Sequence, residues 1–195
     1  YLEKLIAQVF TGRERFEPGN PQEGYSPSPQ ERQSWLQISY MKEAYHTMGP
    51  KFTLGWMAEA LYSSKNFSEN YTATMMQAGE FAPTPHSKLM YNEAFRANQY
   101  VAAGIKPIYV LNDMFQFRTE FYGFTPIFPI KKNALNKAYY GKAFSRFEYM
   151  GEVSVICHLP FGAISAYVNH YSSPRREWNV GMTIGWQLFN YRFVE

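Results

Sequence analysis

Long uninterrupted runs of apolar residues are absent from this chain. No window approaches the roughly 18 consecutive apolar residues that a membrane-spanning helix requires, and the mean hydropathy is −0.40. A helical membrane span is therefore excluded. A membrane-spanning β-barrel remains compatible with this low mean, because half of the side chains on each strand face water.

The chain also lacks cysteine pairs and a strong charge of one sign. The single cysteine, Cys157, excludes an internal disulfide, and its position in an apolar pattern predicts an inert thiol. The net charge is only +3, and no run of Lys and Arg is long enough to form a nucleic-acid stripe. We therefore expect no nucleic acid partner, and we expect the neighbouring Lys131 and Lys132 to lie in a solvated loop.

Motifs of catalysis and cofactor binding are missing as well. The sequence has no Gly-rich phosphate loop, and its histidines lack metal-ligand spacing: His46, His86, His158 and His170. Cys157 and His158 are adjacent, so on a strand they point to opposite faces and form no dyad. We expect no metal and no cofactor, and we assign no catalytic residue to this chain.

Aromatic residues, by contrast, are abundant. The 195 residues include 16 Tyr, 16 Phe and 4 Trp, enough for one domain with a sizeable core. Two interpretations fit this composition: a well-packed soluble β core, or aromatic girdles at the two interfaces of a membrane.

The last long segment alternates with a period of two, which predicts a β-strand with two different faces. One face is apolar: Val180, Met182, Ile184, Trp186 and Leu188. The other is small or polar: Asn179, Gly181, Thr183, Gly185 and Gln187. A membrane strand that places lipid on one side and a wet lumen on the other has this pattern. We predict that the apolar set faces lipid.

The same period recurs along the chain. It predicts strands over residues 35–45, 52–60, 99–109, 115–121, 149–159 and 164–168, and one in the opening segment 5–10. A weaker β tendency covers residues 71–77. We count roughly eight spanning strands. Several are longer than the usual 5–6 residues of globular sheets and approach the roughly 9–11 that a tilted membrane strand needs.

Charged residues lie on the polar faces of these strands. We predict that a lumen accommodates Lys106, Arg118, Glu120, Glu152 and Gln187. A small soluble barrel would have to bury these charges, which is costly without partners, whereas a water-filled or plugged lumen tolerates them. The pair Arg146 and Glu148 repeats the spacing of Arg118 and Glu120, and we interpret both as paired lumen charges.

Connections alternate in length, with short turns near residues 112–113, 159–162 and 172–175 and long links over 79–94 and 125–147. Short turns on one side and long loops on the other are typical of outer-membrane barrels. Residues 1–30 read as an irregular lead-in with a candidate strand, and residues 31–195 as the barrel portion. Because the sequence begins at Tyr1 without Met or a leader, we expect a processed or partial chain.

Two stretches carry distinctive motifs. The first contains Ala82-Pro83-Thr84-Pro85-His86-Ser87-Lys88, then Phe95-Arg96-Ala97-Asn98 and residues 102–109. The second contains Met150-Gly151-Glu152-Val153-Ser154, Leu159-Pro160-Phe161-Gly162, Asn169-His170-Tyr171 and Ile184-Gly185-Trp186-Gln187-Leu188-Phe189-Asn190. From about Ser34 onward, the chain resembles the C-terminal barrel of outer-membrane patatin-like phospholipases, within the surface-antigen barrel superfamily.

This resemblance implies an antiparallel transmembrane β-barrel of about sixteen strands, of which the chain supplies roughly half. It implies location in the bacterial outer membrane and a separate patatin domain that hydrolyses lipid acyl esters with a Ser-Asp dyad. The Gly-x-Ser-x-Gly elbow of that domain does not occur here, and the sequence around Ser165 lacks its spacing. The pattern Asn179, Gly181, Ile184 and Trp186 resembles the signal that the barrel-assembly machinery reads.

We therefore predict an all-β chain that anchors a lipase domain lying outside this chain. A variant of this hypothesis is that the barrel also translocates that domain. Its expected partners are outer-membrane lipid, the remainder of the same barrel, the lipase domain and the assembly machinery; a homodimer stays open. One alternative is a soluble barrel that binds an apolar ligand, with Val180 inside and Arg118 outside. Another is a fragment of a general porin or transporter.

Overall fold

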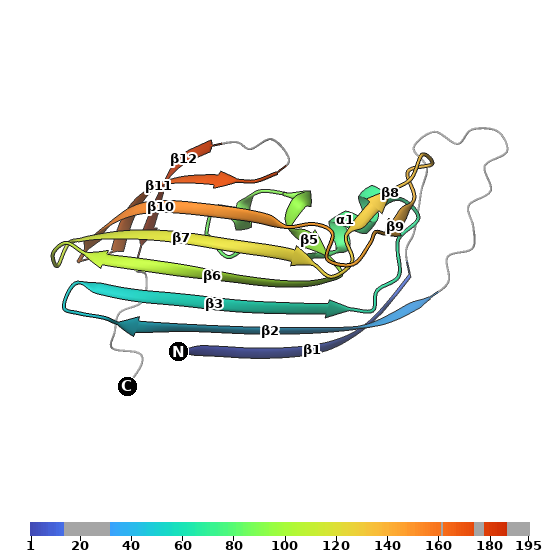
Figure 1. Ribbon diagram of the computed structural model, residues 1–195, viewed down its shortest axis with the longest axis horizontal. Coiled ribbons are helices and arrows are strands. Elements are labelled where there is room, and N and C mark those ends of the chain that lie inside the picture. Colours follow the sequence, from blue (N-terminus) through green and yellow to red (C-terminus); the bar gives the residue numbers. More distant parts are fainter. Residues whose placement is uncertain (14–31, 161, 174–177, 187–195) are drawn as a thin grey trace.

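The chain forms one large antiparallel sheet, described in a computed structural model over residues 1–13, 32–160, 162–173 and 178–186. Eight long strands follow one another in the order β1-β2-β3-β6-β7-β10-β11-β12 (Figure 1). Their bounds are β1 Leu2–Gly12, β2 Gln33–Thr47, β3 Phe52–Ser63, β6 Gln99–Val110, β7 Phe115–Pro126, β10 Glu148–Leu159, β11 Gly162–Tyr171 and β12 Trp178–Trp186.

The expected all-β architecture with about eight long strands is confirmed, because each alternating segment forms a strand of this sheet. Every strand pairs with the next long strand along the chain, so the sheet is a meander without crossovers. The candidate strand of the opening segment extends over all of β1. The rest of the expected lead-in lies outside the described residues.

The connections differ in length at the two ends of the sheet. Three short links, 48–51, 111–114 and 160–161, join strand pairs at one end, which we call the turn end. The opposite end, the loop end, carries the connections 13–32, 64–98, 127–147 and 172–177. The predicted short turns near 112–113 and 159–162 and the predicted long links 79–94 and 125–147 do lie at opposite ends of the sheet. The connection predicted as a short turn at 172–175 instead belongs to the loop end, because β11 runs from the turn end to the loop end.

The connection 64–98 folds into an insert on one face of the sheet, and the hairpin of the connection 127–147 packs against the helix of this insert. Residues 64–98 hold α1 (Tyr71–Gln77), β4 (Gly79–Glu80), η1 (Ser87–Leu89), η2 (Glu93–Phe95) and β5 (Arg96–Ala97). Residues 127–147 hold a small hairpin of β8 (Ile130–Lys132) and β9 (Ala138–Tyr140). Figure 1 shows these elements gathered toward the loop end.

The main core lies between the insert and the sheet. Phe81 and Phe95 of the insert, each 1% exposed, pack with strand residues Tyr100, Tyr122 and Phe124. The ring centroids of Phe81 and Phe124 are 5.9 Å apart in a stacked arrangement. The insert thus owes its position to buried aromatic contacts with the sheet.

The weak β prediction for residues 71–77 was wrong, because this segment forms helix α1. Asn70 caps the helix: its side chain accepts a hydrogen bond from the backbone N–H of Ala73 at 2.8 Å. Tyr71 and Met75 are spaced by one helical turn and are buried against Ile130 of the hairpin. The cap and this tertiary packing outweigh the strand tendency of the two threonines.

The sheet has two free edges, because β1 and β12 each have one neighbour among the described residues. The prediction of an antiparallel sheet is confirmed, whereas its closure into a barrel is not seen. Among the described residues, no helix is long and apolar enough to cross a membrane.

Candidate functional site: two opposed faces of the sheet

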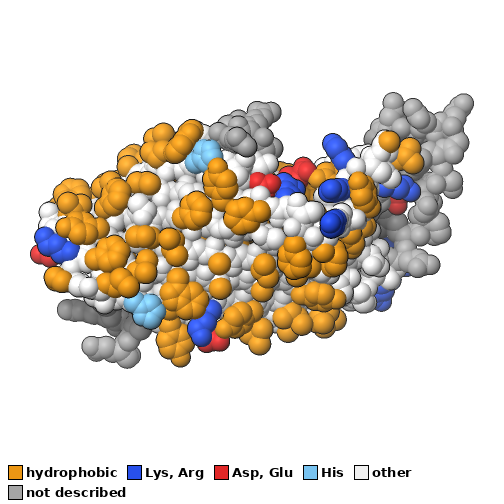
Figure 2. All heavy atoms as spheres, in the orientation of Figure 1, with side chains coloured by type: hydrophobic (Ala, Val, Ile, Leu, Met, Phe, Trp, Pro, Cys, Tyr) orange, Lys and Arg blue, Asp and Glu red, His pale blue; other side chains and the backbone are white. Residues whose placement is uncertain are grey.

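The sheet presents one face that is apolar and exposed, which we call the apolar face. Directly opposed residues on neighbouring strands share a face, so the register fixes its members. Among them are Leu5, Val9, Leu36, Ile38, Phe52, Tyr62, Val101, Ile105, Phe117, Phe121, Val153, Val155, Val168, Val180, Met182 and Ile184, all exposed. Figure 2 shows hydrophobic side chains spread over the strands of this side of the molecule.

Charges are scarce on the apolar face. Glu3 and Lys42 are opposed in β1 and β2, and their side chains are 3.8 Å apart. A continuous exposed apolar surface of this extent marks a contact with lipid or with another protein.

The residues predicted to face lipid belong to this face where the structure describes them. Val180, Met182 and Ile184 are 80%, 65% and 61% exposed. They oppose Val168, Ala166 and Ile164 of β11, so the apolar row continues across both strands. Of the predicted assembly signal, Asn179 and Gly181 lie on the other face of β12 from Ile184. The Trp186 side chain, Gln187 and Leu188 lie outside what the structure describes.

The opposite face carries the insert and the charges, and we call it the covered face. The structure brings four of the five predicted lumen residues together there: Lys106, Arg118, Glu120 and Glu152. Lys106 is 8% exposed, and both Glu120 and Glu152 are 5% exposed. Charges this deeply buried need partners, and each of the four has one.

The Arg118 guanidinium pairs with Glu120 two residues along the same strand, with Nε and Oε1 2.8 Å apart. Glu120 also accepts a hydrogen bond from the hydroxyl of Tyr122. Glu152 accepts one from the amide of Asn169, with Nδ2 and Oε2 3.4 Å apart. Arg146 and Glu148 repeat the first geometry, also at 2.8 Å, so the predicted pairing of both arginines is confirmed.

Lys106 on β6 pairs with Glu43 on β2, across the intervening strand β3. Gly55 of β3 makes this reach feasible, because a Cβ there would meet Cε1 of Tyr45 at 2.7 Å and Cβ of Lys106 at 3.1 Å. Tyr45 in turn donates a hydrogen bond to Glu43 at 2.6 Å. Sequence reasoning missed Glu43, since only the strand register shows that it meets Lys106.

Polar contacts add to the aromatic core in holding the insert. The guanidinium of Arg96 pairs with Glu80 and donates to the backbone carbonyl of Met76 at 2.9 Å. Tyr100 of β6 donates to Glu59 of β3. The Tyr100 hydroxyl also lies 3.2 Å from the backbone carbonyl oxygen of Glu80, so these contacts join the small β4–β5 pair to strands β3 and β6.

The distinctive Thr-Pro-His-Ser motif forms a turn of the insert that reaches β11. The hydroxyl of Ser87 lies 2.9 Å from the backbone nitrogen of Thr84. Nδ1 of His86 lies 2.9 Å from the hydroxyl of Tyr171. Burial lowers the pKa of His86, which favours the neutral ring in this contact.

A cavity of about 520 Å³ remains between the insert and the wall formed by β1, β2, β3 and β6. Its charged lining residues are Glu43, Glu59, Glu80, Lys88 and Lys106. The insert therefore fills the part of the covered face where the aromatic core lies and leaves a cavity next to β1, β2, β3 and β6.

No catalytic or metal centre emerges from the described residues, where no group of His, Cys, Asp and Glu could hold a metal ion. Cys157 lies on the apolar face opposite Phe115, whereas His158 on the other face contacts Gln116 at 3.1 Å. Ser165 belongs to the covered face of β11, opposite Ile156 and Thr183. A scan against family models and searches of curated proteins and solved structures found no match to this chain.

Proposed function

We propose that this chain is part of an outer-membrane β-barrel with a plugged interior, and that it anchors an attached domain. The observation that carries the proposal is the exposed apolar face across all eight long strands, opposite a face with paired, buried charges. A soluble sheet hides its apolar side, whereas a membrane barrel turns it toward lipid. The unequal connections at the two ends support the same assignment.

The free edges of β1 and β12 define the first partner. In lipid, each unpaired backbone N–H or C=O group costs on the order of several kcal/mol, as an unsatisfied buried amide does. An open sheet edge is therefore not stable there. The partner that we propose is the remainder of the same barrel. The resemblance to surface-antigen barrels implies about sixteen strands in the whole barrel. A second copy of the chain, as a homodimer, could pair the same edges.

The insert favours an anchor over an open porin. Its aromatic core occupies the covered face, which is the lumen in this proposal, and leaves only the cavity beside it. The resemblance to patatin-like phospholipases supplies the attached domain, a lipid acyl hydrolase outside this chain. A Gly-x-Ser-x-Gly elbow elsewhere in the protein would distinguish this identity from a general porin or transporter.

The soluble-barrel alternative requires the opposite orientation of the side chains. It places Val180, Met182 and Ile184 inside and Arg118 in solvent. These three apolar residues are exposed, and Arg118 lies on the covered face beside Glu120. This arrangement supports the membrane proposal.

The proposal is tested by spin labels at three consecutive positions of β12: Met182, Thr183 and Ile184. All three are exposed, so burial in protein does not separate them. The protein that carries this chain, with Cys157→Ala, is reconstituted in phosphatidylcholine vesicles. We expect labels at 182 and 184 to collide with oxygen, which concentrates in lipid, and the label at 183 to collide with a water-soluble nickel complex.

Equal access of the nickel complex to all three labels would refute the membrane proposal. A protein that stays monodisperse without detergent or lipid would refute it independently. Labels at Val153 and Ser165, on the apolar and covered faces of β10 and β11, repeat the comparison away from the edge strand.

A further inference from the structure

The segment between β7 and β10 carries a cluster of lysines without acidic residues. Residues 127–145 contain Lys131, Lys132, Lys137 and Lys142 and no Asp or Glu. All four lysines are exposed, and none forms an ion pair with another described residue. We call these four residues the basic patch. Figure 2 shows Lys and Arg side chains gathered at the end of the molecule where β8 and β9 lie.

Exposed apolar side chains adjoin the basic patch. Leu135, Phe144 and Phe147 are 78%, 62% and 64% exposed. Phe144 has a φ of 51°, a conformation that is costly for a bulky residue and that persists only where the surroundings enforce it. Its backbone N–H is held by the carbonyl of Ile127 at 2.9 Å. The Phe144 ring is thus exposed on a segment whose backbone is held in place by Ile127.

Phe147 links the basic patch to the apolar face. A Cβ on Gly123, which faces outward on β7, would meet the Phe147 ring at 3.0 Å. The ring thus lies over the apolar face at its loop end, close to Tyr149, which is opposed to Gly123. The segment that carries the basic patch therefore reaches the loop end of the surface that we propose faces lipid.

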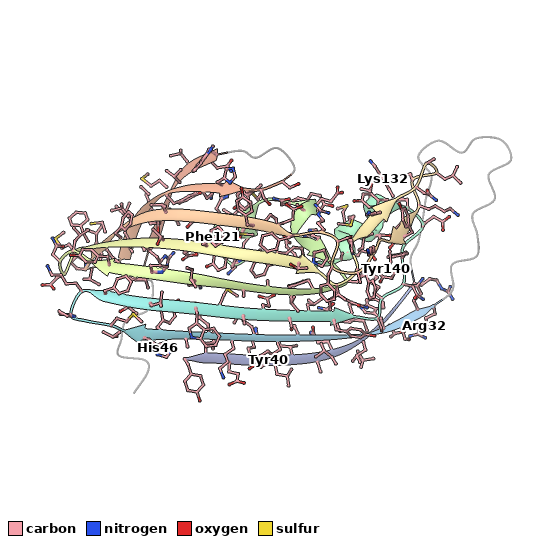
Figure 3. The ribbon with its side chains drawn as sticks, in the orientation of Figure 1. Arg32, Tyr40, His46, Phe121, Lys132 and Tyr140 are labelled. Atoms are coloured by element: carbon pink, nitrogen blue, oxygen red, sulfur yellow. The ribbon has the colours of Figure 1, made fainter. Side chains whose placement is uncertain are left out.

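The lysines are presented by an ordered support. Asn133 closes the hairpin turn, because its side chain accepts hydrogen bonds from the backbone of Leu135 and Lys137. The carbonyl of Asn136 accepts from the N–H of Tyr71, which joins the turn to α1. Figure 3 places Lys132 and Tyr140 at this end of the molecule, and the Tyr140 ring packs against Phe67 with centroids 4.4 Å apart.

We infer that the basic patch binds the phosphate groups of anionic lipids in the leaflet at the loop end. This inference rests on the proposed membrane function. Exposed lysines beside rings at a membrane boundary match this partner, because the ammonium groups meet phosphates while the rings enter the interfacial region. No described carboxylate pairs with these ammonium groups, and only Lys132 lies over a described ring, that of Tyr71, at 5.8 Å. Phe147, in the same segment, lies at the loop end of the apolar face, where the proposed function places the lipid headgroups.

The test places a fluorophore at Leu135→Cys in the Cys157→Ala protein, reconstituted in phosphatidylcholine vesicles. A quencher is carried either by a minor fraction of phosphatidylglycerol or by an equal fraction of phosphatidylcholine. We expect stronger quenching by the anionic lipid, and salt should reduce this preference. Lys131→Gln with Lys132→Gln should lower the preference by about fivefold per lysine removed.

The matched control removes Lys4 and Lys51, which are exposed and lie at the turn end of the sheet. This variant should keep the full preference for the anionic lipid. Equal quenching by both lipids in the unsubstituted protein, or an equal loss in both double variants, would overturn the inference. The spin labels on β12 separate the two proposals, since their alternation persists if only the basic patch is wrongly assigned.

Discussion

Glu120 and Glu152 are directly opposed across the β7–β10 ladder, and both are 5% exposed. Like charges at opposed positions destabilise a sheet, so this pair needs compensation. Arg118 supplies it from the same strand as Glu120, at 2.8 Å. Tyr122 and Asn169 add one hydrogen bond each to the two carboxylates.

Removal of the compensating cation should therefore be costly. Arg118→Met leaves two buried carboxylates without their guanidinium and should lower the free energy of unfolding by about 2–3 kcal/mol, less than a fully buried pair because Arg118 is partly exposed. The double variant with Glu120→Gln should recover part of this loss. Urea unfolding in detergent, followed by tryptophan fluorescence, measures both. Additive losses would show that the two residues are not coupled.

A side chain at Gly104 should destabilise the fold, because the Tyr122 ring occupies the space where a Cβ would lie. A Cβ at Gly104 would meet Cδ1 of Tyr122 at 2.1 Å and the carbonyl oxygen of Phe121 at 2.8 Å. Gly104→Ala should cost about 1–3 kcal/mol, since Tyr122 is fully buried and its ring cannot move away.

Gly151→Ala is the matched control for this substitution. Its nearest neighbours would lie at 3.7 Å or more, which is ordinary contact distance. The two variants differ in packing and share the same chemistry, so equal unfolding midpoints would contradict the role assigned to Tyr122.

The insert should loosen when a ring is removed from the aromatic core that holds it against the sheet. Phe95→Ala removes a ring that is 1% exposed and should destabilise the docked insert by about 3–5 kcal/mol. In planar bilayers we expect higher and noisier ion conductance than in the unsubstituted protein. Leu89→Ala, in the same insert but 85% exposed, should leave the conductance unchanged. An unaltered conductance in Phe95→Ala would show that the insert does not block the lumen.

Docking of the insert should weaken in mild acid. Burial lowers the pKa of His86 below its ordinary value of 6.5, so the docked form favours the neutral ring and the released form takes up the proton first. The contribution is complete above pH 6.5 and is lost as the pH falls through the lowered pKa. Tyr167 and Tyr171 are the groups whose rings face His86.

Amide hydrogen exchange of residues 81–97 measures this effect at neutral and mildly acidic pH. Exchange should be faster in acid in the unsubstituted protein. His86→Gln should remove most of the difference, since glutamine does not titrate in this range. A pH dependence of the same size in both proteins would assign it to another group.

The strands could be predicted from the sequence because their signal is local. From Val180 to Ile184, apolar residues alternate with small or polar ones, and this alternation predicts the face on which each side chain lies. The same holds for the segment around Phe121. The predicted faces of Lys106, Arg118, Glu120 and Glu152 followed from the same period. The solvated position expected for Lys131 and Lys132 also agrees with their exposure, although both belong to the short strand β8.

The insert could not be predicted in the same way. Its elements are short, and its core residues Phe81 and Phe95 acquire their burial from Tyr122 and Phe124 on distant strands. The pairing of Lys106 with Glu43 depends on the register of three strands and on the space above Gly55. Such contacts have no period along the sequence, so only the assembled sheet reveals them.

The even number of long strands has a consequence for compartments. Leu2 at the start of β1 and Trp186 at the end of β12 both lie at the turn end, so the polypeptide enters and leaves the sheet on the same side. If the sheet spans a membrane as proposed, soluble domains joined before or after it share one aqueous space. The lysine-bearing hairpin then lies on the other side of that membrane, where such domains do not obstruct the lipid contact that we infer.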